Sequence, residues 1–143
     1  RSAPNTFDLH MPHAQYDPVD GGWLFKPHYV PAYGRGKNVT KVLNGKIQTF
    51  TTFDRDSFGF AYVANSAGTK KMFYYCSADD GALYSRSLTD AVPKPDVKIP
   101  LNVPGMSCVS GSGGAVTYSP TRNSVVFSYS LNGLTGIAEF KLN

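Results

Sequence analysis

The amino-acid sequence predicts an all-β fold of antiparallel strands, most simply a β-sandwich or barrel of about 10–12 short strands. Short runs of aromatic and β-branched residues recur along the whole chain, separated by turns rich in Gly, Pro, Asn and Asp. No window shows a helical period over more than one turn. The chain holds one Glu, Glu139, against nine Asp, a balance that disfavours helices because Glu is the better helix former.

Composition indicates one domain, residues 1–143, with a surface typical of secreted proteins. The 143 residues are 41% apolar but only 17% charged, below the roughly 25% of ordinary globular chains. The basic residues are scattered, so the formal net charge of +4 does not predict nucleic-acid binding. No stretch approaches the ~20 apolar residues that a membrane-spanning helix needs.

Residues 1–37 are predicted to form an irregular, proline-rich arm packed on the domain. Five of the ten prolines precede Tyr33, too many for a continuous helix or a central strand. Aromatic and aliphatic residues along the arm provide anchors that a disordered tail would lack. Gly21-Gly22 before Trp23–Lys26 indicates a turn into a short strand. The chain begins at Arg1 without Met, which we expect to reflect a processed, secreted protein.

The strongest hairpin signal lies at Asn44-Gly45. Val39–Leu43 and Lys46–Phe53 flank this pair, which suits a two-residue turn because both central positions need positive φ. The next segment, Phe53–Ser57, is predicted to be a polar turn, and Phe58–Ala64 an alternating strand.

Another predicted hairpin, Thr69–Leu88, is repeated later in the chain. Asn123–Leu142 has the same order of strand, turn and strand 53 residues later, so that Tyr74 matches Phe127. The second copy keeps the apolar strand but lacks the cysteine and the acidic turn of the first. The shared part is therefore predicted to be scaffold, and a specific role is sought in the residues particular to the first copy.

Shorter strands are predicted around the proline-punctuated segment 90–105. An edge strand fits Val97–Leu101, and a short strand fits Met106–Val109. Three further strands, Ala115–Tyr118, Ser124–Ser130 and Thr135–Leu142, complete the chain.

The last of these segments resemble a β-propeller blade. Tyr118-Ser119-Pro120, followed by Val125–Ser130 and Ile137–Leu142, gives the order of strand, Ser-Pro turn, strand, short turn and strand. A closed propeller generally needs four or more blades of roughly forty residues. A repeat of 53 residues fits fewer than three times, so this alternative implies blades completed by oligomerisation or by a partner chain.

Two further signals point to an oxidising compartment. Cys76 and Cys108 are the only cysteines, and an even count in such a chain predicts one disulfide. Asn38 begins an Asn-Val-Thr sequon, which predicts glycosylation in a surface loop. Both predictions agree with an extracellular, secreted location.

The sequence carries no catalytic signature. His10 and His13 have a spacing that allows metal binding, with His28 nearby, and they are the candidate ligands for a divalent metal such as zinc or copper. Surface histidines on an irregular arm are the simpler interpretation. Asp79-Asp80 does not match the spacing of a calcium loop, and such residues also suit the turn itself.

Exposed aromatic residues are the remaining candidates for function. Tyrosine and tryptophan can stack on apolar ligand faces while their polar atoms form hydrogen bonds. Tyr74 and Tyr75 must face opposite sides of their strand, so one can lie in the core while the other is presented on the surface. The candidate ligand-binding residues come from the arm and from the repeated hairpin, and they are Trp23, Tyr29, Tyr33, Asp79, Asp80 and Arg86.

These observations favour a secreted binding module over an enzyme, with carbohydrate or a cell-surface partner as ligand and no resident cofactor. A shallow site would bind weakly, so a homo-oligomer that adds multivalency is expected. Two alternatives stay open. One is a small secreted hydrolase or metal-dependent enzyme that uses the N-terminal histidines, and the other is an effector or toxin that acts through a protein surface.

Overall fold

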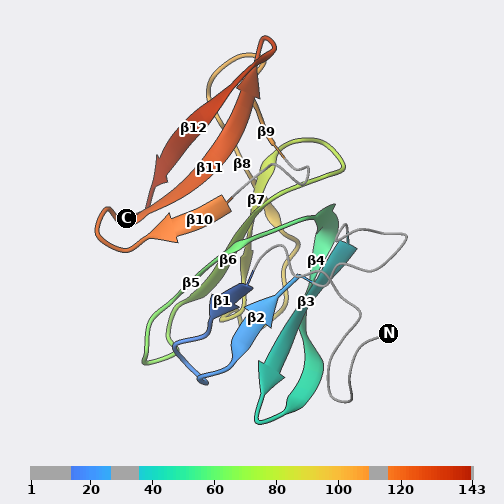
Figure 1. The fold of residues 1–143 in the computed structure, drawn as a ribbon, viewed down its shortest axis with the longest axis vertical. Coiled ribbons are helices and arrows are strands. Elements are labelled where there is room, and N and C mark those ends of the chain that lie inside the picture. The colour runs from blue at the N-terminus through green and yellow to red at the C-terminus, as the bar shows by residue number, and fades with distance from the viewer. Residues whose placement is uncertain (1–13, 27–35, 110–115, 143) are drawn as a thin grey trace.

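The computed structural model describes residues 14–26, 36–109 and 116–142, and these residues are organised entirely by β-strands. Twelve strands form three four-stranded antiparallel sheets, and each sheet comes from one continuous stretch of the chain (Figure 1). The prediction of an all-β, antiparallel fold of short strands is confirmed. Three sheets in chain order correspond to the blade-like alternative more closely than to one two-sheet sandwich or one closed barrel.

Sheet 1 has the strand order β1-β2-β3-β4. Its strands are β1 (Ala14–Tyr16), β2 (Trp23–Phe25), β3 (Gly36–Leu43) and β4 (Lys46–Ser57). Asn44 and Gly45 have φ values of 52° and 74°, so the tight turn predicted between β3 and β4 is confirmed.

The described part of segment 1–37 is not the irregular arm that its prolines suggested. Residues 14–26 contribute β1 and β2, and Gly36 begins β3. Pro18 lies in the turn between β1 and β2, where its missing N–H removes no hydrogen bond from the sheet. Leu24 is fully buried, so local apolar alternation outweighs the proline content in this segment.

The predicted polar turn at Phe53–Ser57 is also wrong, because β4 continues through it. Phe53 and Ser57 are buried, and the polar residues between them are used by the neighbouring sheet. The backbone N–H of Asp54 donates to the Asp96 carboxylate at 2.9 Å, and that of Asp56 donates to the Asp79 carboxylate at 3.2 Å. This polar segment can therefore form a strand, because carboxylates from sheet 2 accept hydrogen bonds from the N–H groups at its free edge.

Sheets 2 and 3 follow in the chain. Sheet 2 has the order β5-β6-β7-β8, with strands β5 (Ala61–Ala64), β6 (Lys71–Cys76), β7 (Leu83–Ser87) and β8 (Val97–Ile99). Sheet 3 has the order β10-β11-β12, and β9 also pairs with β11. Its strands are β9 (Ser107–Cys108), β10 (Val116–Ser119), β11 (Ser124–Leu131) and β12 (Leu134–Lys141).

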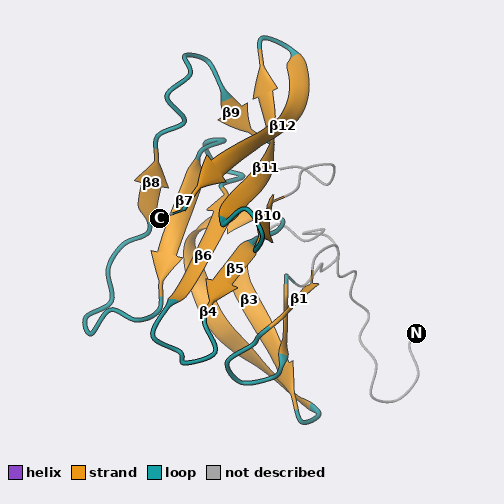
Figure 2. Cartoon of the chain, turned by 90° about the vertical axis from the view of Figure 1, so that its left-hand side faces the viewer, coloured by secondary structure: helices purple, strands orange, loops and turns teal. Residues whose placement is uncertain are grey.

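Two hydrophobic cores hold the three sheets together, so sheet 2 is covered on both faces (Figure 2). The first core joins sheets 1 and 2 and includes Phe53, Phe73 and Tyr75. The second joins sheets 2 and 3 and includes Tyr74 and Phe127. Tyr74 and Tyr75 do face opposite sides of their strand, as predicted, but neither is presented on the surface, because each faces a different core and both are buried.

The repeat at an offset of 53 corresponds to real hairpins. β6 and β7 are the second and third strands of sheet 2, and β11 and β12 form the matching hairpin of sheet 3. Tyr74 and its match Phe127 both lie in the second core, from opposite sides. The two copies are therefore scaffold, as predicted, and these matched residues lie in the same core.

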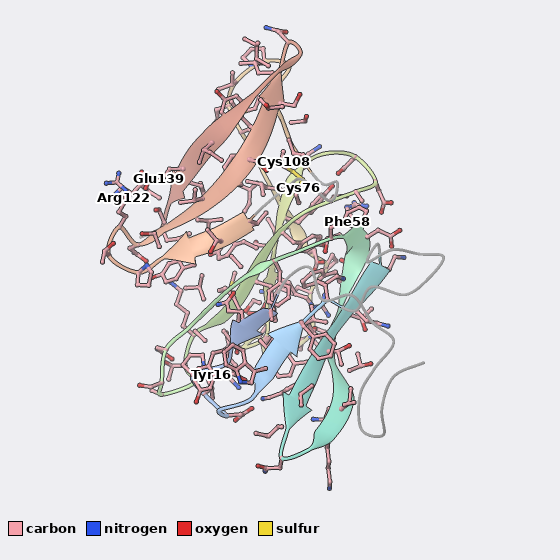
Figure 3. The ribbon with its side chains drawn as sticks, in the orientation of Figure 1. Tyr16, Phe58, Cys76, Cys108, Arg122 and Glu139 are labelled. Carbon is pink, nitrogen blue, oxygen red and sulfur yellow. A yellow bond between two sulfur atoms is a disulfide. The ribbon has the colours of Figure 1, made fainter. Side chains whose placement is uncertain are left out.

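The predicted disulfide joins Cys76 of β6 to Cys108 of β9, with their Cα atoms 5.9 Å apart (Figure 3). It closes a loop of 32 positions and connects sheet 2 to sheet 3. Both cysteines are nearly fully buried, and neither is free.

Replacing Cys76 and Cys108 together by serine is expected to lower the free energy of unfolding by about 2–4 kcal/mol, because the cross-link restricts the unfolded chain. Urea unfolding of the variant and of the reduced wild-type protein should give the same loss. Two thiols that alkylate without reduction in the native protein would contradict the assignment.

Within residues 14–26, 36–109 and 116–142, the fold offers no helix that is both long and apolar enough to cross a bilayer.

Candidate ligand-binding face

An apolar row crosses the outer face of sheet 1. The register aligns Tyr16 with Trp23, Trp23 with Val42, and Val42 with Ile47, so one residue from each strand lies in the row. Tyr16, Trp23 and Ile47 are 49%, 54% and 45% exposed. We call these four residues the aromatic face. Leu24, the neighbour of Trp23 along β2, points to the opposite side and is buried in the first core.

Trp23 and Tyr16 form its centre. Their ring centroids are 5.3 Å apart and their planes are inclined at 71°, an edge-to-face contact that fixes both side chains on the strand pair. Other aromatic residues of sheet 1, such as Phe25 and Phe53, are buried. Large aromatic surface held rigidly in solvent is what a stacking ligand requires.

A buried ion pair fixes the turn beside the aromatic face. The Nζ atom of Lys41 is 2.9 Å from Asp17 Oδ2 and 2.6 Å from Asp20 Oδ2. The Lys41 and Asp17 side chains are almost fully buried, whereas that of Asp20 is 49% exposed. The hydrogen bond from Lys41 and its positive charge lower the pKa of Asp20, so this carboxylate is ionised at neutral pH.

The backbone of the same turn is also well ordered by hydrogen bonds. The Asp17 N–H donates to Gly22 O at 2.8 Å, and the Gly21 N–H donates to Asp17 O at 2.9 Å. A Cβ atom at Gly22 would lie 2.8 Å from Val42 O, so only glycine lets β2 approach β3 this closely. Asp20 is therefore held at the end of the strand pair that carries Tyr16 and Trp23.

The turn between β6 and β7 repeats this hydrogen-bond pattern. The Ser77 N–H donates to Ala82 O at 2.8 Å, and the Gly81 N–H donates to Ser77 O at 3.0 Å. The matching sequences are DPVDGG and SADDGA, sixty positions apart. The sequence analysis identified the hairpin that repeats after 53 residues but missed this repeat of the turn after 60 residues. The readable signal is an Asp-Gly pair that begins three residues after an Asp or a Ser.

The acidic residues predicted to bind ligand in the second turn have structural partners instead. Asp80 Oδ2 accepts the Tyr84 hydroxyl at 2.5 Å, and Asp80 Oδ1 accepts the Ala82 N–H at 3.2 Å. Asp79 accepts the Asp56 N–H from sheet 1. These contacts cross-link the turn and the first core, and they do not place Asp79 or Asp80 beside Trp23.

Arg86 likewise belongs to a network between sheets 1 and 2. Its Nη1 atom lies 2.7 Å from Asp96 Oδ1, and its Nε donates to Thr51 Oγ1 at 2.9 Å. The buried Asp96 carboxylate also accepts the Tyr75 hydroxyl. Burial and this hydrogen bond raise the pKa of Tyr75, so the phenol stays neutral. Arg86 therefore neutralises a buried carboxylate in the structure.

Lys26 is the other buried cation near the first core. Its Nζ donates to Gly36 O at 2.6 Å and lies 5.2 Å from the centroid of the Phe53 ring. Burial lowers its pKa to about 7, against a smaller opposing effect of Asp56. The hydrogen bond and the ring contact stabilise the charged form, and Lys26 lies on the side of the strand away from solvent, so it is not part of the aromatic face.

The remaining predicted site residues divide into two groups. Tyr29, Tyr33, His10, His13 and His28 lie outside the described residues, and the metal prediction rests on them. Asn38 is exposed but lies in strand β3, where a surface loop was expected, and its Oδ1 accepts the Thr52 hydroxyl at 3.0 Å. Among the residues described, no group of three or more His, Cys, Asp or Glu side chains is arranged to hold a metal ion.

Among the predicted ligand residues that the structure describes, Trp23, Asp79 and Asp80 are exposed, and of these Trp23 lies in the aromatic face. The structure adds Tyr16, Val42 and Ile47, which were not among the candidate ligand-binding residues. The Asn44-Gly45 turn offered one usable signal, because its register pairs Val42 with Ile47. No local sequence signal predicted that β1 would pair with β2 across a six-residue turn.

Comparisons with known proteins give little to place the chain in a family. No family model matches it, and no curated protein matches it. A solved structure described as the crystal structure of a nidogen/laminin complex has a similar arrangement, with a TM-score of 0.48 and 12% sequence identity. The match covers 91% of this chain and 48% of that chain, so this chain spans about half of its length.

Proposed function

We propose that this protein is a secreted binding module that recognises carbohydrate through the aromatic face of sheet 1. The observation that carries the proposal is the pair Trp23 and Tyr16, two half-exposed rings in contact on a rigid strand pair. An internal disulfide supports the secreted location, because such bonds rarely persist in a reducing cytosol.

The chemistry of the site suits a sugar. The C–H faces of a pyranose stack on aromatic rings, and Trp23 with Tyr16 supplies such a platform. The polar atoms of the platform itself are the Tyr16 hydroxyl and the Trp23 indole N–H, which can form hydrogen bonds with sugar hydroxyls. The proposal assigns binding and no catalysis.

Replacing Trp23 by alanine is expected to weaken binding to a glycan identified on an array by about 2 kcal/mol, or roughly 30-fold, because the central aromatic contact is lost. Tyr16→Ala should cause a smaller loss. Titration calorimetry measures both affinities, and thermal unfolding checks that the variants fold.

Val92→Ala is the matched control, because Val92 is 71% exposed but lies in the connection between β7 and β8. Its affinity should equal that of the wild type. An array without a bound glycan, or unchanged affinity in Trp23→Ala, would contradict carbohydrate binding at this face.

A protein ligand is the second candidate for the same surface. The row continues from the rings into Val42 and Ile47, so it is apolar from end to end, as the centres of protein interfaces are. Ile47→Ala separates the two candidates. It should leave glycan affinity unchanged but weaken a protein complex that covers the whole row.

A further inference from the structure

The edges of the three sheets are protected in different ways, with one exception. An unpaired edge strand presents free N–H and C=O groups, and proteins usually shorten it, bulge it or cap it. β1 and β8 have three residues each, and β9 and β10 have two and four. β4 is long, but its pairing with β3 contains register shifts, and carboxylates from sheet 2 cap two of its N–H groups.

The edge of β5 is capped by a side chain that imitates a strand. The Gln15 amide accepts the Tyr62 N–H at 2.9 Å and donates to Tyr62 O at 2.5 Å. β12 shows none of these devices in the part of the chain that is described. It has eight residues, pairs with β11 through all of them without a register shift, and lies at the outer border of the molecule (Figure 1).

The register shows which groups of β12 face outward. Asn132 and Gly133 form a two-residue turn with φ values of 51° and 80°, and in such a turn the flanking pair is hydrogen-bonded. Hydrogen-bonded pairs then alternate along the hairpin, and the Leu142 N–H indeed donates to Asn123 O at 2.9 Å. The residues that turn their N–H and C=O groups away from β11 are Thr135, Ile137, Glu139 and Lys141.

These four residues determine how a second copy would fit. Two identical antiparallel strands pair about a two-fold axis, and the outward groups of one must meet the outward groups of the other. In one register all four residues form hydrogen bonds to the second copy, and this register has its two-fold axis at Ala138. It places Thr135 opposite Lys141 of the second copy, and Ile137 opposite Glu139 of the second copy.

We propose that the outer edge of β12 is a homodimer interface, in which β12 pairs antiparallel with β12 of a second copy about an axis at Ala138. Sheet 3 then continues across both copies. The pairing also covers exposed apolar surface, because Leu134, 73% exposed, lies opposite Leu142 of the second copy.

The charges of the strand are compatible with this register. No two like charges are directly opposite each other, which is the arrangement that destabilises strand pairs. The two copies of Glu139 approach diagonally across the axis. Each is already neutralised by Arg122, whose Nε and Nη2 atoms lie 2.5 and 2.8 Å from the carboxylate (Figure 3).

Sedimentation velocity over a range of protein concentrations tests the interface. The wild-type chain should shift with concentration toward twice its 15.5 kDa mass. Ile137→Pro removes an outward N–H and should stay monomeric at every concentration, with its fold kept because proline is tolerated at edge strands. Thr49→Pro is the matched control, because Thr49 has the same place after the turn in β4, and it should dimerise as the wild type does.

Cysteine cross-linking tests the register itself. Opposite residues at a non-hydrogen-bonded pair lie about 4.5 Å apart, within disulfide range. Ala138→Cys should therefore form a covalent dimer on mild oxidation, whereas Leu134→Cys should not, because Leu134 faces Leu142. A wild-type protein that stays monomeric, or equal cross-linking of the two variants, would overturn the proposal. Trp23→Ala should still dimerise, so this result is independent of glycan binding.

Discussion

Replacing Phe73 by alanine is expected to lower the free energy of unfolding by about 3–5 kcal/mol, the largest effect of a single side chain in the first core. Phe73 is fully buried in β6, and its ring contacts four others. These belong to Phe50, Phe53, Phe60 and Tyr62, with centroids 4.6–6.1 Å away. Removing the ring leaves a cavity between sheets 1 and 2 that the surrounding rigid rings cannot fill.

Urea unfolding followed by tryptophan fluorescence measures this loss, since Trp23 lies in sheet 1. Phe73→Leu should cost less, because it keeps part of the volume. Val92→Ala, at a position 71% exposed, should leave stability unchanged. A loss of under ~1 kcal/mol in Phe73→Ala would mean that the first core does not hold sheets 1 and 2 together.

The second large effect is expected at Lys41. Lys41→Met should lower the free energy of unfolding by about 3–5 kcal/mol, because it leaves the buried Asp17 carboxylate without its cation. The ammonium also lies 4.8 Å from the centroid of the Phe50 ring, and this contact is lost as well. Chemical denaturation at neutral pH measures the change.

A double-mutant cycle isolates the ion pair in that loss. Adding Asp17→Asn to Lys41→Met removes the uncompensated charge and should recover a large part of the stability. Asp20→Asn alone should cost much less, since Asp20 is half exposed and water can solvate it. If the double variant is as unstable as the sum of the single variants, the two side chains are not coupled.

Local sequence patterns predicted the strands of this protein better than their arrangement. The Asn44-Gly45 turn and the repeated hairpins depend on neighbouring residues, so their signals are readable in one sequence. The polar stretch Phe53–Ser57 was misassigned because carboxylates from distant loops satisfy it. Such partners depend on tertiary contacts that no local pattern contains.

The candidate site was predictable only in part for the same reason. Trp23 was identified as a large aromatic residue in a turn-and-strand segment. Asp79, Asp80 and Arg86 looked equally suitable. In the structure Asp79 and Arg86 form hydrogen bonds to sheet 1, and Asp80 binds Tyr84 within sheet 2. Tyr75 was a possible surface residue until sheet 1 covered it. Whether a polar or aromatic residue remains exposed to solvent depends on which neighbouring sheet packs over it.

The order of the sheets along the chain also bears on how the protein is made. Sheet 1 is complete at Ser57, yet the side chains that cover Phe53 come from β6, which the ribosome delivers later. A nascent chain that has finished sheet 1 therefore displays an uncovered aromatic surface until Phe73 and Tyr75 emerge. During this interval the chain is most exposed to aggregation, and the rate of elongation from residue 58 to residue 75 sets its duration.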